Sequence, residues 1–364
     1  MTRGPLAICY GTRPQVIKAS MLIESSRPRF PLLTLDTGQH YDYKLNEVFY
    51  EQLGVRRPDH FLEVGSGAHA VQSSVILTRA AAVFESAHPS AVIVIGDTNS
   101  TLGCALAAAQ MRIPVVHVEA GLRAADRGMA EEINRRVVDT LADLLCAPST
   151  AAKAQLELEH QSGAIVFTGD IAHDVLRRNL PRARRPAGEA DWPLPPGTSY
   201  AVATLHRAEL TDKPDVLQAT VAALRSLPLP VVFPVHPRVS AAMETLGLTS
   251  GGMLHVMSPL GYFEMIGAIR DASVIITDSG GVQREAYWLG IPCVTMRNET
   301  EWHETVALGA NVLVAPAKAE SDLAGVVATR LRTERTWDRT AYGSGDAAAR
   351  ITDALELLEK RRGL

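Results

Sequence analysis

Polar side chains that could carry chemistry gather directly after short apolar runs of this 364-residue chain. The polar segments are residues 11–15, 38–42, 96–100 and 119–123 in the first half, and 206–207, 236–238, 278–281 and 297–301 in the second. Tight turns require only Gly, Asn and Asp, whereas these segments also carry His, Arg and Glu. Such side chains transfer protons and stabilise charge. The pattern therefore predicts a reactive site.

The segment from Thr277 to Gly290 predicts a strand, a turn of small residues and a helix N-terminus. The adjacent glycines Gly280 and Gly281 allow the backbone to approach a ligand closely, and the free N–H groups of a first helical turn suit a diphosphate. Glu285, one turn further on, is placed to accept the two hydroxyls of a ribose. A simple tight turn with a capping Ser279 and a solvated Glu285 would fit the same residues, because glycine pairs are common.

A second cluster spans residues 129–136. The apolar spacing predicts a helix whose core stripe is Ile133, Val137, Leu141 and Leu144. Glu131 and Arg135 then lie together on the opposite side. They are either part of a site or an exposed ion pair worth a few tenths of a kcal/mol.

The elements that position these side chains are short apolar strands alternating with Ala- and Leu-rich helices. The expected strands are residues 6–10, 31–35, 91–95, 113–118, 143–147 and 164–167, then 200–204, 230–235, 254–257, 273–277, 292–296 and 310–314. Strands that are apolar throughout indicate parallel sheets covered on both faces. We therefore expect an α/β fold with two Rossmann-like doubly wound domains. Ligands of such sheets bind outside the carboxyl ends of the strands, so the polar segments should share one crevice.

Length alone favours two domains. We place the first at residues 1–169 and the second at 170–345, with the crossing near Gly169. The Pro-rich stretch 179–198 is expected to be a surface loop inside the second domain. Residues 346–364 contain an amphipathic helix that carries Ile351, Leu355 and Leu358 on one stripe and could pack back on the N-terminal domain.

Composition excludes several classes of protein. The chain is 46% hydrophobic and 21% charged, which predicts a globular protein rather than a disordered one. A net charge of −4 argues against a nucleic-acid partner. The sequence lacks a run of about 20 apolar residues and an export signal, so neither a membrane partner nor export is expected. Cys9, Cys104, Cys146 and Cys293 are dispersed, which favours buried thiols in the cytoplasm over disulfides or a metal site.

Seven segments, in order, give the chain a resemblance to the non-hydrolysing UDP-N-acetylglucosamine 2-epimerase family. They are Gly11–Gln15, Gly96–Thr98, His117–Arg123, Glu131–Arg135, His206–Leu210, Pro234–Arg238 and Thr277–Ala286. The resemblance implies a glycosyltransferase-B-like fold, a UDP-sugar in the interdomain cleft and a homodimer. The implied reaction is reversible epimerisation at C2 of UDP-N-acetylglucosamine to UDP-N-acetylmannosamine, in which UDP is eliminated to leave a 2-acetamidoglucal and then added back.

The resemblance also implies roles for individual residues. The catalytic residues would be Asp97, Glu119, Glu131 and His206. The substrate-binding residues would be Arg13, Lys18, Arg135, His236, Ser279, Gly280, Gly281 and Glu285. No cofactor and no metal are expected, and the chain has no convincing GxGxxG fingerprint after the first strand.

The chain departs from the family pattern at several positions. Gln15 replaces a Glu, Ala130 replaces a Pro and Arg284 replaces a Glu. The altered loop Gln39–Asp42 argues against activation by substrate, and it resembles the branch that acts on 2,3-diacetamido-glucuronic acid nucleotides. A modified UDP-2-acetamido sugar is therefore a second possible substrate. Three rival functions fit the same residues: a hydrolysing epimerase that releases N-acetylmannosamine, a glycosyltransferase and a UDP-sugar sensor.

Overall fold

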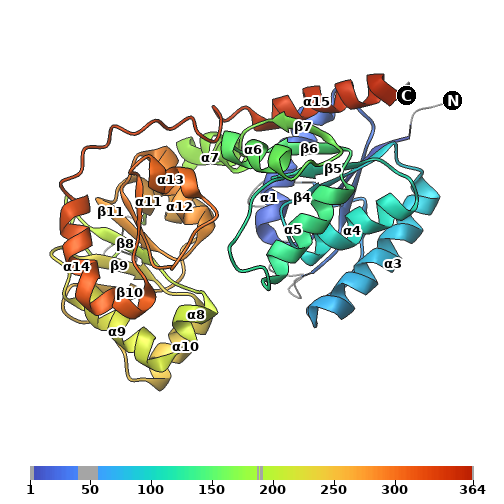
Figure 1. The fold of residues 1–364 in the computed structure, drawn as a ribbon. Helices are drawn as coiled ribbons and strands as arrows, with labels where there is room; N and C mark the ends of the chain where they lie inside the picture. Colours follow the sequence, from blue (N-terminus) through green and yellow to red (C-terminus); the bar gives the residue numbers. More distant parts are fainter. Residues whose placement is uncertain (1–3, 40–55, 187, 189–191, 363–364) are drawn as a thin grey trace. The chain divides into compact units, whose positions relative to one another are not determined.

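The computed structural model describes residues 4–39, 56–186, 188 and 192–362, which fold into two compact units (Figure 1). Unit 1 comprises residues 1–175 and 340–364, and unit 2 comprises residues 176–339. The first boundary lies after Val175, six residues beyond the expected crossing at Gly169. It falls inside helix α7 (Ile171–Asn179), which begins two residues after that glycine. The second falls six residues before the expected division at 346.

Unit 1 is built on a parallel sheet whose order is β3-β2-β1-β4-β5-β6-β7 within the described residues. Its strands are β1 (Leu6–Tyr10), β2 (Leu32–Asp36), β3 (His60–Phe61), β4 (Ala91–Ile95), β5 (Val115–Val118), β6 (Leu144–Ala147) and β7 (Ala164–Phe167). Its helices are α1 (Arg13–Ser26), α3 (His69–Ala87), α4 (Asn99–Gln110), α5 (Ala130–Leu141), α6 (Thr150–Leu158), the first half of α7, and α15 (Ala347–Arg362). The sequence pattern missed β3, which has only two residues.

Unit 2 carries a second parallel sheet, in the order β10-β9-β8-β11-β12-β13 among the described residues. Its strands are β8 (Ala201–Thr204), β9 (Val231–Pro234), β10 (Leu254–Met257), β11 (Val274–Thr277), β12 (Cys293–Thr295) and β13 (Asn311–Leu313). Its helices are α8 (Ala208–Thr211), α9 (Pro214–Arg225), α10 (Pro237–Thr245), α11 (Tyr262–Arg270), α12 (Gly280–Leu289), α13 (His303–Ala307) and α14 (Ala319–Arg330), with 3-10 turns η1 (Leu180–Arg182) and η2 (Pro316–Lys318). The predicted class, two doubly wound α/β domains, is confirmed.

Both faces of each sheet are buried, which explains why the strands are apolar throughout. In β1, Leu6 and Ile8 enter one core cluster, and Ala7 and Cys9 enter the cluster on the opposite face. Helix α15 packs beside α1 on the first of these faces, where Ile351 joins the same core (Figure 1). The C-terminal helix thus belongs to unit 1 although it follows unit 2 in the chain.

The Pro-rich segment is more than a surface loop. Trp192, within it, is buried and meets the edge of the Tyr200 ring, with the ring centroids 5.2 Å apart. This aromatic anchor fixes the segment to the core of unit 2.

The strand order reverses between β1 and β4 in unit 1, and between β8 and β11 in unit 2. These two places are topological switch points, where the loops that leave adjacent strands run in opposite directions. Open α/β sheets bind their ligands in the crevice at such points. Gly11–Arg13 and Gly96–Asp97 follow β1 and β4 directly, and His206 and Asp278–Gly281 follow β8 and β11. The predicted polar segments therefore stand at the ligand-binding position of each sheet.

Candidate active site

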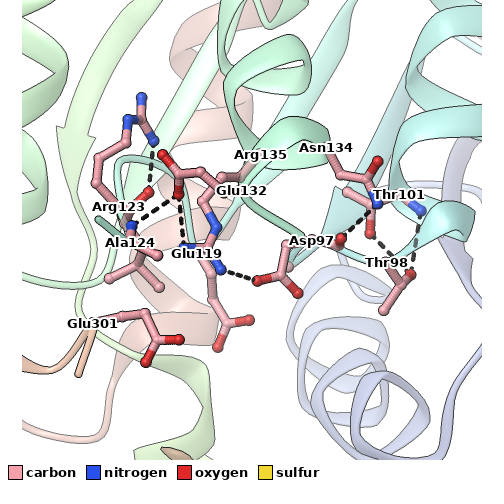
Figure 2. Close-up of polar contacts among 12 residues, drawn as sticks. Asp97, Thr98, Thr101, Glu119, Arg123, Ala124, Glu132, Asn134, Arg135 and Glu301 are labelled. Carbon is pink, nitrogen blue, oxygen red and sulfur yellow. Dashed lines mark hydrogen bonds and ion pairs between the residues drawn. The ribbon is translucent and has the colours of Figure 1, made fainter. Parts of the chain in front are cut away.

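The turn after β4 presents Asp97. Gly96 adopts a left-handed φ of 69°, which glycine accepts without strain, and Thr98 caps α4 by accepting a hydrogen bond from the Thr101 N–H. The Asp97 carboxylate accepts a hydrogen bond from the Arg135 guanidinium at 2.6 Å (Figure 2). The Asn134 side chain donates to the Asp97 carbonyl oxygen at 2.9 Å. Asp97 is therefore held by both its backbone and its side chain.

The turn after β5 presents Glu119 in a strained conformation. Its φ of 70° lies in the left-handed region, which costs a non-glycine residue about 1–2 kcal/mol. The side chain is buried and ion-paired with Lys18 Nζ at 2.7 Å. A Cβ added to Gly96 would lie 3.2 Å from Glu119 Oε2, so this carboxylate rests against the turn that carries Asp97. The two predicted catalytic carboxylates are thus brought close together, each with its own cation.

Gln15, which replaces a family Glu, ties the first strand loop to the β4 turn. Its side-chain oxygen accepts hydrogen bonds from the backbone N–H groups of Gly11 and Thr12. Its amide nitrogen donates to the Ile95 carbonyl oxygen at 2.6 Å and to the Thr98 hydroxyl at 2.9 Å. An ionised Glu could not donate to that carbonyl, whereas the neutral amide accepts from the backbone N–H groups and donates to the Ile95 carbonyl. Arg13, at the first position of α1, is exposed.

Helix α5 is oriented differently from the prediction. Ile133 and Val137, expected in the core, are 49% and 38% exposed, and Leu144 lies in β6 rather than on the helix. The buried residues of α5 are instead Glu132, Asn134, Arg135, Val138 and Asp139. The apolar-stripe prediction was wrong, because a polar face can be buried when partners from other elements satisfy it.

Arg135 is buried, so the alternative of an exposed Glu131–Arg135 ion pair is wrong. Arg135 bridges Asp97 and Glu132, at 2.6 and 3.1 Å (Figure 2). Glu132 accepts from the Arg136 Nε as well, at 2.6 Å, and from the Ala124 backbone N–H at 2.8 Å. Glu131 is half-buried at the first turn of the same helix.

Unit 2 presents His206 after β8. Asp278, buried after β11, accepts hydrogen bonds from the backbone N–H groups of His206 and Arg207, both at 2.8 Å, and lies 2.9 Å from His206 Nδ1. Burial alone would raise the pKa of Asp278, but the His206 ring and these N–H groups outweigh it and lower that pKa. The pair directs Nδ1 toward the carboxylate, and the imidazole is half exposed.

Helix α12 begins at Gly280 after the N-cap Ser279, whose hydroxyl accepts from the Val282 N–H. A ten-residue helix capped in this way presents free N–H groups to an anion. A Cβ at Gly280 would lie 2.8 Å from Trp302 Nε1, so the close approach requires glycine. Gly281 follows in the same first turn.

Glu285 lies one turn into α12. Burial raises its pKa to about 7, although the neighbouring Arg284 charge opposes the shift. Arg284, which replaces a family Glu, stacks on the Trp302 ring at 3.8 Å. His236 is exposed and caps α10, with its Nδ1 accepting from the Arg238 N–H at 3.3 Å.

Sequence reasoning missed the roles of Glu132, His117, Asp139 and Asp278. The spacing of Glu132, Arg135, Arg136 and Asp139, at i, i+3, i+4 and i+7, was the available signal for a polar face on one side of α5. Gln39 accepts hydrogen bonds from the N–H and hydroxyl of Ser100, whereas the rest of the altered loop, residues 40–42, lies outside the described residues. All four cysteines are buried free thiols, and no helix of the described residues is long and apolar enough to cross a membrane.

Known proteins match this chain almost end to end. The family model described as UDP-N-acetylglucosamine 2-epimerase matches residues 24–356. The UDP-2,3-diacetamido-2,3-dideoxy-D-glucuronate 2-epimerase of Pseudomonas aeruginosa is 40% identical over 356 residues, 96% of this chain and 98% of that protein. The crystal structure of Methanocaldococcus jannaschii UDP-GlcNAc 2-epimerase in complex with UDP-GlcNAc and UDP has a TM-score of 0.86 at 34% identity and covers 97% of this chain and 99% of its own. CalG4, a calicheamicin glycosyltransferase, shares the fold at a TM-score of 0.62 and 14% identity. The chain belongs to the UDP-N-acetylglucosamine 2-epimerase family.

Proposed function

We propose that the chain catalyses reversible C2 epimerisation of a UDP-2-acetamido sugar, with UDP-N-acetylglucosamine as the principal substrate. The observation that carries the proposal is the pair Asp97 and Glu119 at neighbouring strand ends beside the β1/β4 switch point, each fixed by its own cation. The family membership and the UDP-GlcNAc-bound relative support the choice of substrate.

The chemistry requires a base, an acid and a site for the leaving group. The C2–H of an acetamido sugar is barely acidic, so the C1–O bond to UDP breaks first and its electron pair leaves with UDP. Positive charge at C1 then acidifies C2–H, and a carboxylate removes this proton to form the C1=C2 double bond of the glycal. In the return step, UDP adds back at C1 while a proton reaches the opposite face of C2. Inversion therefore requires proton-transfer groups on both faces of the sugar.

Unit 1 supplies the carboxylates for these steps. Asp97, Glu119 and Glu131 are the proton-transfer candidates, and Lys18 and Arg135 hold the first two in place. Arg13 stands at the loop after β1, where it would meet the departing diphosphate.

Unit 2 supplies the groups for UDP. The α12 N-terminus with Ser279, Gly280 and Gly281 suits the diphosphate, and the imidazole of His206, oriented by Asp278, stabilises the leaving group. Glu285 would bind the ribose hydroxyls, and His236 contributes at the neighbouring strand end.

Incubation with UDP-N-acetylglucosamine in heavy water tests the proposal. We expect deuterium at C2 of both recovered substrate and product, detected by NMR, because the proton that returns to C2 comes from a group that has equilibrated with the solvent. UDP should not accumulate, which separates this reaction from a hydrolysing epimerase, whereas a glycosyltransferase would leave C2 unlabelled. A C2 that stays protonated while the folded protein binds the ligand contradicts the proposal and favours a UDP-sugar sensor.

A modified sugar is the second candidate substrate. The 40% identical relative acts, by its name, on UDP-2,3-diacetamido-2,3-dideoxy-D-glucuronate. The same exchange experiment with this nucleotide, compared with UDP-N-acetylglucosamine by kcat/KM, decides between the two.

UDP affinity should depend on pH through Glu285. Its pKa of about 7 in the free protein means that the carboxylate is half protonated near neutrality, whereas a carboxylate that accepts two ribose hydroxyls must be ionised. Binding must then release a proton, so UDP affinity falls as pH drops through 7. We expect Kd, measured by calorimetry, to be about tenfold weaker at pH 6 than at pH 8.

Glu285→Gln is the control for this titration, since its amide does not ionise. Its UDP affinity should fall less between pH 8 and pH 6 than that of the wild type, because the contribution of Glu285 is removed. Equal slopes for the variant and the wild type would remove Glu285 from the nucleotide site.

We further propose a cytoplasmic homodimer. The buried free thiols suit a reducing compartment. The exposed Val71, Ile133 and Val137 are apolar side chains that a second copy would cover. Light scattering of the purified chain measures the number of copies.

A further inference from the structure

Eight side chains of unit 1, alternately acidic and basic in type, form a closed circuit, the charge ring. Its ion pairs, in order around the circuit, are Asp97–Arg135 (2.6 Å), Arg135–Glu132 (3.1 Å), Glu132–Arg136 (2.6 Å), Arg136–Glu159 (3.5 Å), Glu159–Arg123 (2.5 Å), Arg123–Asp139 (2.7 Å) and Asp139–His117 (2.6 Å). The ring closes because His117 Nε2 lies 2.8 Å from the carbonyl oxygen of Gly96, the residue before Asp97. Both ends of the circuit therefore reach the same catalytic turn.

His117 completes this ring. Its side chain and that of Asp139 are both 0% exposed. Its two ring nitrogens face two oxygens, Asp139 Oδ1 and the Gly96 carbonyl, and a carbonyl oxygen can only accept. The other Asp139 oxygen receives N–H donors from Arg123 and Gly121, which suits a carboxylate. An imidazolium that donates from both nitrogens satisfies every partner.

The contacts of His117 link the strand before Glu119 to the turn of Asp97. His117 lies on β5, two residues before Glu119, and its bond to Gly96 joins that strand to the turn of Asp97. The Gly96 N–H also donates to the Val118 carbonyl oxygen at 2.9 Å. Both backbone polar groups of Gly96, its N–H and its carbonyl, are therefore bonded to residues of β5. Arg135 then fixes the Asp97 carboxylate from helix α5.

We propose that His117, held by Asp139, is a positioning residue that sets the separation of the Asp97 and Glu119 carboxylates. The inference rests on the proposed epimerase function and deepens it. The hydrogen bond from His117 to the Gly96 carbonyl is the contact on which kcat depends. The contact between His117 and Asp139 contributes mainly to the stability of the fold.

Two substitutions separate these bonds. In His117→Asn the shorter amide reaches Asp139 but not Gly96, so we expect kcat for C2 exchange to fall about 10- to 100-fold with KM and UDP Kd changed less than about threefold. In His117→Gln the longer amide reaches Gly96, and kcat should recover to within about tenfold of wild type, although the melting temperature falls. If H117N does not fold, His117→Met, apolar and of similar size, also lacks a donor for Gly96 and should show the same loss of kcat.

Asp174→Asn is the matched control. Asp174 is a buried carboxylate of the same unit that accepts the backbone N–H groups of Ala347 and Ala348, at 3.0 and 2.9 Å. It lies on α7 and is not a member of the charge ring, so D174N should lower stability and leave kcat unchanged.

Three results would overturn the inference. They are a kcat of H117N within about threefold of wild type, no advantage of H117Q over H117N or H117M, or an equal loss of kcat in D174N. Absence of C2 exchange in the wild type would instead refute the proposed function, and the positioning role with it.

Discussion

Glu119→Gln is expected to lower the rate of C2 deuterium exchange by about a thousandfold, the range associated with loss of a proton-transfer group. An amide has nearly the same shape as the carboxylate but cannot take or return the proton. It also leaves Lys18, 2.7 Å from Glu119, without its counter-charge. Apart from Arg13, the UDP-binding groups that we propose belong to unit 2, so UDP Kd should change by less than about tenfold.

Exchange is measured by NMR and UDP affinity by calorimetry on the same preparation. Glu157→Gln is the matched control, because Glu157 also pairs with a lysine, Lys153 at 2.8 Å, on the exposed face of α6. This variant should retain full activity. A collapse of UDP affinity in E119Q comparable to its loss of exchange would show that Glu119 binds the nucleotide or maintains the structure instead.

Glu132→Ala should cost about 3–5 kcal/mol of unfolding free energy, the penalty for breaking a buried ion pair from one side. Glu132 is fully buried and compensates two guanidinium groups, those of Arg135 and Arg136. Its removal leaves Arg135, which is only 4% exposed, with Asp97 as its remaining ring partner, and leaves the Ala124 N–H without its acceptor. The effect should appear as a lower urea midpoint.

Glu132→Gln provides the graded comparison. The amide oxygen can still accept from the Ala124 N–H, so this variant should be more stable than E132A and less stable than wild type. A loss below about 1 kcal/mol in E132A would mean that the charge ring contributes no more than a surface network.

Helix α5 shows where sequence reasoning stops. Its apolar residues predicted one orientation, and the structure has the other, with Glu132, Arg135 and Asp139 turned inward. Periodicity reports which residues share a face, but it does not report which face is buried. That choice depends on partners such as His117 and Asp97, 22 and 38 residues distant along the chain from Asp139 and Arg135.

The same distinction applies to His206. Its residue type and its position directly after a strand identified it as a candidate from the sequence, because both can be read from neighbouring residues. Its orientation comes from Asp278, 72 residues away, which is adjacent only because β8 and β11 pair. Glu285 was likewise visible as a carboxylate, whereas its pKa of about 7 arises from burial.

The sequence by itself determined the two parallel sheets, the position of nearly every strand and the placement of Asp97, Glu119 and the α12 N-terminus after those strands. Apolar runs and polar strand ends are local patterns, and a parallel sheet buried on both faces permits few different arrangements. Only the tertiary structure decided which face of α5 is buried, how the charge ring closes on Gly96 and which carboxylate orients His206. Those outcomes depend on charges and donors brought together from distant segments, where the energy of each contact is set by burial and geometry rather than by residue type.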